Sequence, residues 1–144
     1  MRCLRVFLDS SFMIYLKYAA DDKISNFSLE LLDGAIKLGT QLISNIIAID
    51  EVIWILEHKY GVSRAEVFEL TDKLGSLLDI VPLDRSDYDP MKVFMNSYNL
   101  KPSDALHVAS MKRNNIQHIV SEDGDFDALP WIKRVWLDTG NRIA

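Results

Sequence analysis

The sequence predicts an α/β fold: a three-layer α/β/α sandwich around a central parallel sheet of four to five strands. Short, continuous apolar runs, which are typical of buried parallel strands, occur along the chain. Longer segments lie between them, in which apolar residues recur every three or four positions as they do on the packed face of a helix. Strands that alternate with helices in this way imply a parallel sheet with right-handed crossovers and helices on both faces.

The first part of the chain is expected to form three strands and four helices. The strands are expected at residues 6–8, 41–44 and 80–83, and Pro82 in the last of them favours a strand end or an edge strand. The first two helices are expected at residues 12–18, with Ser10 as N-cap, and from Ser25 to a stop at Gly39. The next two are expected at residues 46–60, closed by Gly61, and from Ser63, with the apolar stripe Val67, Leu70, Leu74 and Leu77.

The second part is expected to add two helices and two strands. A helix is predicted over residues 86–98, and strands over residues 118–121 and 134–137. Pro102 suits the first position of the other helix, where no backbone N–H is needed, and Asp104 falls in the first turn of that helix.

The composition fits one domain over residues 1–144. The 144 residues are 49% hydrophobic and 26% charged, so the chain can bury a core without disulfides. Cys3 is the one cysteine, which excludes a disulfide framework and a thiolate metal cluster and favours a reducing cytoplasm. The richest apolar stretch, residues 46–56, contains two acids and is too short to span a membrane. We therefore expect a cytoplasmic protein with no membrane association.

Carboxylates gather where the predicted strands end. Asp9 directly follows the first strand, and Asp123 and Asp125 follow the fourth. Sites in open α/β sheets form outside the carboxyl ends of the strands, so these acids can meet if the two strands are neighbours. Asp104 lies in the opening turn of the helix before the fourth strand, and Glu51 interrupts an apolar helix, where an unpaired charge is costly.

Each acid also has a purely structural explanation. Asp104 could complement the dipole of its helix, Asp123 and Asp125 could be turn residues, and one of Asp50 and Glu51 could face solvent. Clustered carboxylates, however, repel one another unless a cation lies among them. Oxygen ligands without cysteine or paired histidines favour Mg²⁺ or Mn²⁺, and these ions serve phosphoryl chemistry.

The net charge of −5 does not exclude a nucleic-acid substrate. Without Asp9, Glu51, Asp104, Asp123 and Asp125, the other 16 of the 21 acidic residues balance the 16 Lys and Arg. The candidates for phosphate contacts are Lys17, Lys37, Lys101, Lys112 and Arg113.

At these acids the sequence resembles the PIN-domain family of metal-dependent ribonucleases, particularly the small VapC-type toxins. Four motifs line up in order across almost the whole chain: residues 6–11 around Asp9, residues 43–51 ending at Glu51, residues 103–109 around Asp104, and residues 121–126 around Asp123. No single motif is specific. The resemblance is carried by the ordered set, in which the four acids are 42, 53 and 19 residues apart.

The resemblance implies a metal-dependent endoribonuclease that hydrolyses phosphodiester bonds of single-stranded RNA and is the toxin of a toxin–antitoxin pair. It implies catalytic roles for Asp9, Glu51, Asp104 and Asp123, a Mg²⁺ or Mn²⁺ site formed by these four acids and Asp125, and supporting roles for Ser10 and Ser121. It selects Glu51 rather than Asp50 as the functional acid of that pair. The implied partners are RNA, an antitoxin protein and a second copy of the chain.

Other interpretations account for fewer of these residues. A phosphoacceptor receiver domain needs an acid pair after the first strand and a lysine after the last, whereas the expected last strand is followed by Asp138. A haloacid-type phosphatase needs an Asp-x-Asp motif, which residues 9–11 lack. The non-enzyme alternative is a PIN-fold module that binds RNA or protein without cutting. His107, three residues after Asp104, could face the site, although a core or surface position is favoured for it.

Overall fold

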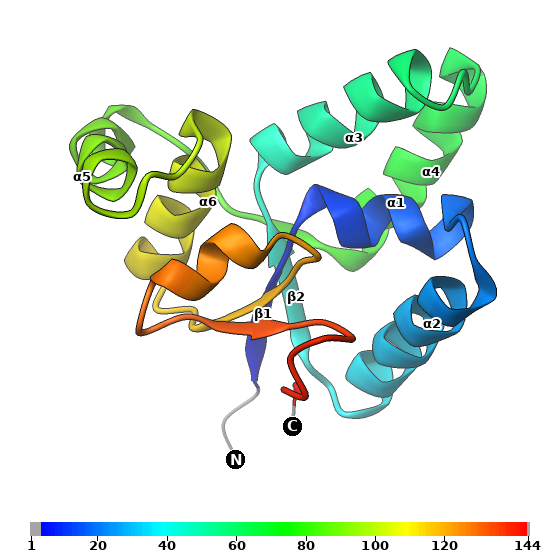
Figure 1. The fold of residues 1–144 in the computed structure, drawn as a ribbon. Helices are drawn as coiled ribbons and strands as arrows, with labels where there is room; N and C mark the ends of the chain where they lie inside the picture. Colours follow the sequence, from blue (N-terminus) through cyan, green and yellow to red (C-terminus); the bar gives the residue numbers. More distant parts are fainter. Residues whose placement is uncertain (1–3, 144) are drawn as a thin grey trace.

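The computed structural model describes residues 4–143 and contains a five-stranded parallel sheet with helices on both faces (Figure 1). The strands are β1 (Arg5–Leu8), β2 (Gln41–Ser44), β3 (Asp79–Ile80), β4 (His118–Val120) and β5 (Lys133–Val135). The α-helices are α1 (Ser10–Tyr18), α2 (Asp22–Lys37), α3 (Ile46–His58), α4 (Arg64–Leu77), α5 (Tyr88–Tyr98) and α6 (Pro102–Arg113). The two short 3₁₀ helices are η1 (Arg85–Asp87) and η2 (Gly124–Ala128). The predicted α/β/α sandwich is confirmed; Cys3 lies outside the described residues.

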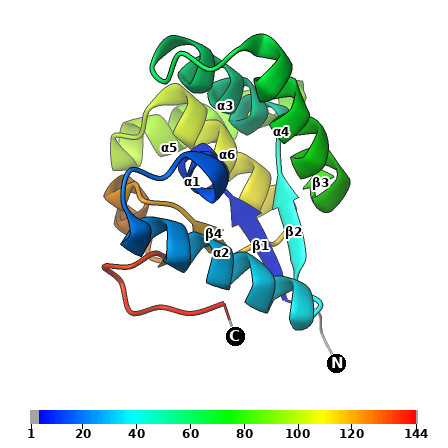
Figure 2. The same cartoon turned by 90° about the vertical axis from the view of Figure 1, so that its right-hand side faces the viewer.

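The strand order β3-β2-β1-β4-β5 places β1 at the centre of the sheet. β1 pairs in parallel with β2 on one side, with Val6 opposite Leu42, and with β4 on the other side, with Leu8 opposite Val120. In Figure 2 the arrows of β1 and β2 point the same way. Because the chain builds outward from β1 in both directions, β1 and β4 flank the switch point where α/β sheets form their sites. This adjacency meets the condition under which the strand-end acids come together.

Each face of the sheet packs against its own set of helices. Successive side chains of β1 alternate, so that Val6 and Leu8 contribute to one core cluster and Phe7 to the other. The first cluster takes its α-helical residues from α1 to α4, and the second takes its own from α5 and α6. Figure 1 shows this division, with α5 and α6 to the left of β1 and β2, and α1, α2 and α4 to their right.

Two predicted helix starts are wrong because an aspartate supplies the N-cap. Helix α1 begins at Ser10, not two residues later, because the Asp9 carboxylate accepts the N–H of Ser10 at 2.8 Å. Helix α2 begins at Asp22 rather than Ser25, because the Asp21 carboxylate accepts a backbone N–H of the first turn.

Three further differences from the predicted elements lie between α4 and α5. The third strand is Asp79–Ile80 instead of residues 80–83, since Pro82 has no N–H with which to continue the ladder. Helix α4 starts after Ser63 as predicted, but Leu77 is 46% exposed and the extended residue Leu78 is buried instead. Over residues 86–98, η1 precedes α5, so the α-helix starts at Tyr88.

Among the described helices, none has the length and apolar character that crossing a bilayer requires.

Candidate metal centre

Four of the five acids predicted from the sequence meet in one cavity at the carboxyl edge of the sheet. The cavity has a volume of about 440 Å³. Its lining residues come from the ends of β1 and β4 and from α1, α3 and α6: Asp9, Ser10, Ser11, Glu51, Lys101, Ser103, Asp104, Glu122, Asp123 and Gly124. Asp50 is exposed and is not among them. The structure therefore places Glu51, and not Asp50, beside the other acids.

Asp9 is held by donors on both of its carboxylate oxygens. Oδ1 accepts the backbone N–H of Ser10 at 2.8 Å, and Oδ2 accepts the hydroxyl of Ser121 at 2.5 Å. The residue is only 5% exposed. Burial raises the pKa of Asp9, and the nearby Glu51 carboxylate adds to that rise. Ser10 supports Asp9 through its backbone, whereas Ser121 does so through its hydroxyl.

Ser121 also connects the ends of β1 and β4. Its Oγ donates to Asp9 and accepts the backbone N–H of Asp123 at 3.0 Å. The Asp123 carboxylate in turn accepts the N–H of Asp125 at 2.9 Å and so caps η2. One hydroxyl therefore fixes the distance between the first acid of the site and the loop that carries the last two.

Asp104, Asp123 and Asp125 form a cluster of three carboxylates within the site. Each offers an oxygen, and the three oxygens lie within 4.8 Å of one another. Asp125 is exposed and does not line the cavity. Burial raises the pKa of Asp104 to about 7, and the charges of Asp9, Asp123 and Glu51 contribute to the rise. These acids therefore repel one another in the folded protein.

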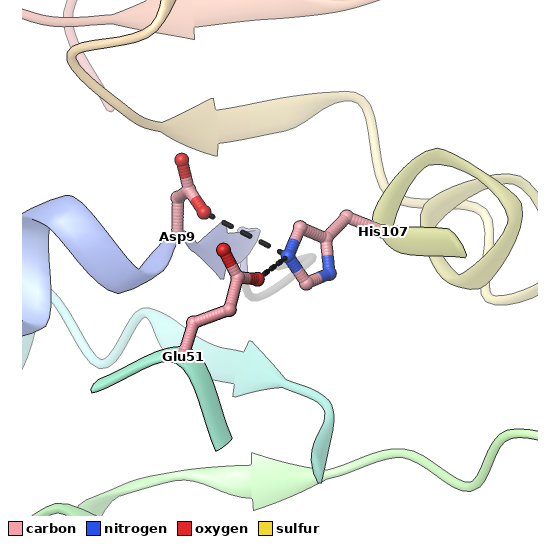
Figure 3. A group of neighbouring side chains, drawn as sticks. All are labelled: Asp9, Glu51 and His107. Atoms are coloured by element: carbon pink, nitrogen blue, oxygen red, sulfur yellow. Dashed lines mark hydrogen bonds and ion pairs between the residues drawn. The ribbon is translucent and has the colours of Figure 1, made fainter. Parts of the chain in front are cut away.

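His107 was not expected at the site from the sequence, but the structure buries it there. Its Nε2 is 2.8 Å from Oε1 of Glu51 and 3.8 Å from Oδ1 of Asp9 (Figure 3). The ring is fully buried, which agrees with the core position that the sequence favoured, but it also contacts the acids. The spacing of His107 from Asp104 could have indicated this position, because a residue three positions after Asp104 lies on the same side of the helix.

Arg134 fixes the loop that carries Asp123 and Asp125. The side chain is 3% exposed. It donates to the carbonyl of Ser121 at 3.2 Å and to Asp127 at 2.9 Å, and thereby binds both sides of the loop. A second carboxylate, that of Asp138, accepts at 3.0 Å. The arginine thus orders the loop while its charge is directed to acids outside the cavity.

The donor set fits a hard divalent cation. The cavity gathers carboxylate and hydroxyl oxygens, which suit Mg²⁺ and Mn²⁺, and the mutual repulsion of the acids favours a positive charge among them. Asp9, Glu51, Asp104 and Asp123 would hold such an ion, with Asp125 at the exposed rim.

Lys101 is the one basic residue among those that line the cavity. It immediately precedes α6 and is exposed. Within the described part of the chain, no carboxylate lies within the 4.0 Å of its ammonium that would define an ion pair. Its charge is therefore available to an anion that enters beside the acids.

The PIN domain family model matches residues 6–132. The VapC ribonuclease Mb1869c of Mycobacterium bovis and ribonuclease VapC13 of Mycobacterium tuberculosis are each 27% identical over 134 residues, which cover 90% of this chain and 98% of theirs.

Similar solved structures include VapC20 of Mycobacterium tuberculosis, a Sarcin-Ricin loop cleaving toxin, with a TM-score of 0.70 and 17% identity over 85% of this chain and 93% of that one. A toxin–antitoxin complex from Klebsiella pneumoniae has a TM-score of 0.64 and 17% identity over 89% of this chain and 95% of that one. VapBC2 of Rickettsia felis, bound to a DNA fragment from its promoter, also has a TM-score of 0.64 and 17% identity, over 92% and 98%. These likenesses concern the fold.

We predict that a divalent cation and pH act together on stability through Asp104. The pKa of Asp104 is raised from 3.8 to about 7 in the folded protein. At pH values between these two, Asp104 is therefore protonated in the folded state and ionised in the unfolded state. The metal-free protein should therefore lose stability as pH rises through this interval. Millimolar Mg²⁺ or Mn²⁺ should restore the stability. At a cation concentration of ten times Kd, the free energy of unfolding should rise by about 1.4 kcal/mol.

Melting temperatures measured in EDTA and in Mn²⁺ across this pH range test the prediction. Asp104→Asn should remove most of the fall with pH and most of the response to Mn²⁺. The exposed acid Asp50 provides the matched control, because Asp50→Asn should behave as the wild type. Identical melting of the wild type with and without metal would contradict the assignment of this centre.

We also predict that Arg134→Met destabilises the protein by about 1–3 kcal/mol, because it leaves buried backbone acceptors without a donor. The same variant should bind Mn²⁺ more weakly, since the loop with Asp123 loses its anchor. Denaturant unfolding and calorimetric titration with Mn²⁺ measure the two effects. Arg64→Met, which removes an exposed arginine paired with Glu57, is the control and should change neither quantity appreciably. Equal Mn²⁺ affinities of Arg134→Met and the wild type would show that the loop does not need this anchor.

Proposed function

Because the chain belongs to the PIN-domain family, we propose that its acidic cavity is the active site of a divalent-metal-dependent endoribonuclease that hydrolyses phosphodiester bonds of single-stranded RNA. The observation that carries the proposal is the meeting of Asp9, Glu51, Asp104 and Asp123 in one cavity at the switch point of the sheet. The curated relatives named as VapC ribonucleases support this activity.

The chain's residues divide the work of the proposed site. When bound, a divalent cation supplies Lewis acidity that lowers the pKa of a water and offsets the negative charge of the phosphate. Asp9, Glu51, Asp104 and Asp123 would hold the cation. Ser121 keeps the ends of β1 and β4 in register, because its hydroxyl bonds to both Asp9 and the backbone of Asp123.

The proposal extends to the partners and the setting of the protein. Since the similar structures include a toxin–antitoxin complex and VapBC2, we assign the chain the role of a toxin that pairs with an antitoxin protein. We place the protein in the cytoplasm as one catalytic domain over residues 1–144. Ile46 and Trp54 of α3 are 58% and 52% exposed, and such apolar residues suit the surface of a homodimer.

A non-catalytic PIN-fold module is the alternative, and the burial of the acids argues against it. A scaffold that only binds RNA or protein has no need to keep Asp9 and Asp104 buried and mutually repelling, which is costly in the absence of a cation. Metal-dependent hydrolysis of RNA separates the two functions.

We predict that Glu51→Gln and Asp9→Asn each reduce RNA cleavage by at least about 100-fold, more than is typical for residues that merely support a metal ligand. Each substitution keeps the shape of the side chain and removes a charge that holds the cation. Cleavage of one single-stranded RNA at saturating Mn²⁺, with circular dichroism to verify folding, is the measurement. Asp50→Asn is the matched control for Glu51→Gln and should retain activity within a few-fold. If Asp50→Asn abolished cleavage and Glu51→Gln did not, Asp50 and not Glu51 would be the acid of the active site.

We further predict that Lys101→Gln raises KM for RNA about 5- to 10-fold, because one charge-assisted contact with phosphate is lost. The variant should also reduce the salt dependence of RNA binding by about 0.7 in the log–log slope expected per phosphate contact of a single strand. Lys133 is the first residue of β5 and so lies at the amino end of the strands, away from the cavity. It is also exposed, so Lys133→Gln is the control. If both lysine variants bind RNA equally well, Lys101 does not contact the substrate.

A further inference from the structure

A chain of buried hydrogen bonds connects the start of α3 with Glu51 in the second turn of the same helix. Asn45 caps α3, because its Oδ1 accepts the N–H of Ala48 at 3.0 Å. Its Nδ2 lies 3.0 Å from Nδ1 of His107 and 3.1 Å from Oγ of Ser110. On the other side of the ring, Nε2 of His107 lies 2.8 Å from Oε1 of Glu51.

The cap determines which nitrogen of His107 carries the hydrogen. The backbone N–H of Ala48 can only donate, so the atom of Asn45 that faces it must be the oxygen. The other end of the Asn45 amide is then the NH₂ group, which also can only donate. Nδ1 of His107 must accept this hydrogen bond and is therefore unprotonated. In the neutral ring the hydrogen is on Nε2, from which it is donated to Glu51.

This tautomer makes His107 unsuitable as a metal ligand. Nε2 of His107, Oδ1 of Asp9 and a carboxylate oxygen of Glu51 are close enough together to suggest a three-ligand site, since all lie within 4.8 Å of one another. A histidine nitrogen binds a metal through a lone pair, however, and on Nε2 that position is occupied by the hydrogen. The lone pair on Nδ1 is directed away from the acids and engaged by Asn45.

Packing prevents the ring from adopting another arrangement. His107 is fully buried, and its ring lies 5.3 Å from that of Phe7 between their centroids. Asn45 and Ser110, its neighbours in the hydrogen-bonded chain, are also fully buried. A half-turn of the ring would place C–H groups opposite Asn45 and Glu51, and the other tautomer would place an N–H opposite the NH₂ group of Asn45. Either change leaves buried polar atoms without partners, which costs about 1–3 kcal/mol for each group.

We propose that His107 is a positioning residue, which donates from Nε2 to Glu51 and thereby orients that carboxylate toward the cation, and that it does not bind the cation itself. Donation to Oε1 leaves Oε2 of Glu51 free to face the cavity. The inference rests on the proposed metal-dependent function, to which it adds the residue that fixes the acid from α3.

Nuclear magnetic resonance of the protein with ¹⁵N-labelled histidine tests the tautomer directly. The ring nitrogens of His107 should show a protonated Nε2 and an unprotonated Nδ1 both in EDTA and at saturating Mg²⁺. Spectra of His58→Gln and His118→Gln assign the signals, because the chain has three histidines. Loss of the hydrogen from Nε2 when Mg²⁺ is added would overturn the proposal, since that is the behaviour of a ligand.

Titration with Mn²⁺ alone tests the positioning role. His107→Leu should weaken Mn²⁺ binding about 10- to 100-fold, the range typical of residues that orient a metal ligand. His107→Gln should recover most of the affinity, because its amide NH₂ reaches the position of Nε2 and can donate to Glu51. If the leucine variant does not fold, the glutamine variant and the wild-type spectra still decide. Wild-type affinity in His107→Leu, or no recovery in His107→Gln, would overturn the proposal.

These measurements separate the inference from the proposed function, because neither uses RNA. A wild-type protein that binds Mn²⁺ with His107 in the predicted tautomer but does not cleave RNA would refute the ribonuclease function alone. A protein that cleaves RNA while Nε2 of His107 is unprotonated would refute the positioning role alone.

Discussion

The parallel pairing of β1 with β4 brings the ends of two strands side by side, and the site is built around this pair. Asp9 continues the ladder, since its N–H donates to the carbonyl of Val120 at 3.1 Å. The Ser121 hydroxyl then joins the Asp9 carboxylate to the backbone of Asp123. Residues 112 positions apart in sequence are thereby fixed within hydrogen-bonding distance before any cation is present. Helices α3 and α6 add Glu51 and Asp104 to this pair from outside the sheet.

The protein orders its acids without neutralising them. Asp9 is fixed by a hydroxyl and a backbone N–H, and Glu51 by a histidine donor. Arg134, the buried cation nearest the loop, pairs with Asp127 and Asp138 instead of the acids of the cavity. The cavity therefore keeps its negative charge. Burial and this charge together raise the pKa of Asp104 and lower stability in the absence of a cation. Such destabilisation at a preorganised site is a common consequence of function.

The start of α3 has two functions that depend on each other. The oxygen of Asn45 caps the helix, and its NH₂ group is thereby left to face His107. Because His107 contacts Glu51 in the second turn of the same helix, the cap and the acid are held in a fixed relation. A serine or aspartate at this position could also cap the helix. Neither would present the amide donors that Asn45 directs at the ring.

The sequence by itself determined the fold class, the strand order along the chain and the four places where acids follow strands or enter helices, because apolar periodicity and strand-end charge are local properties. The ordered motifs were also sufficient to name the family. Helix starts at Ser10 and Asp22 were missed, since Ser, Asp and Asn are nearly equivalent as caps and only the backbone shows which one is used. The resemblance had selected Glu51 over Asp50, and the cavity contains Glu51. Tertiary structure alone decided that β1 and β4 are neighbours and that His107 bonds to Glu51 across 56 residues. Each of these depends on how distant segments pack, and no local pattern carries that information.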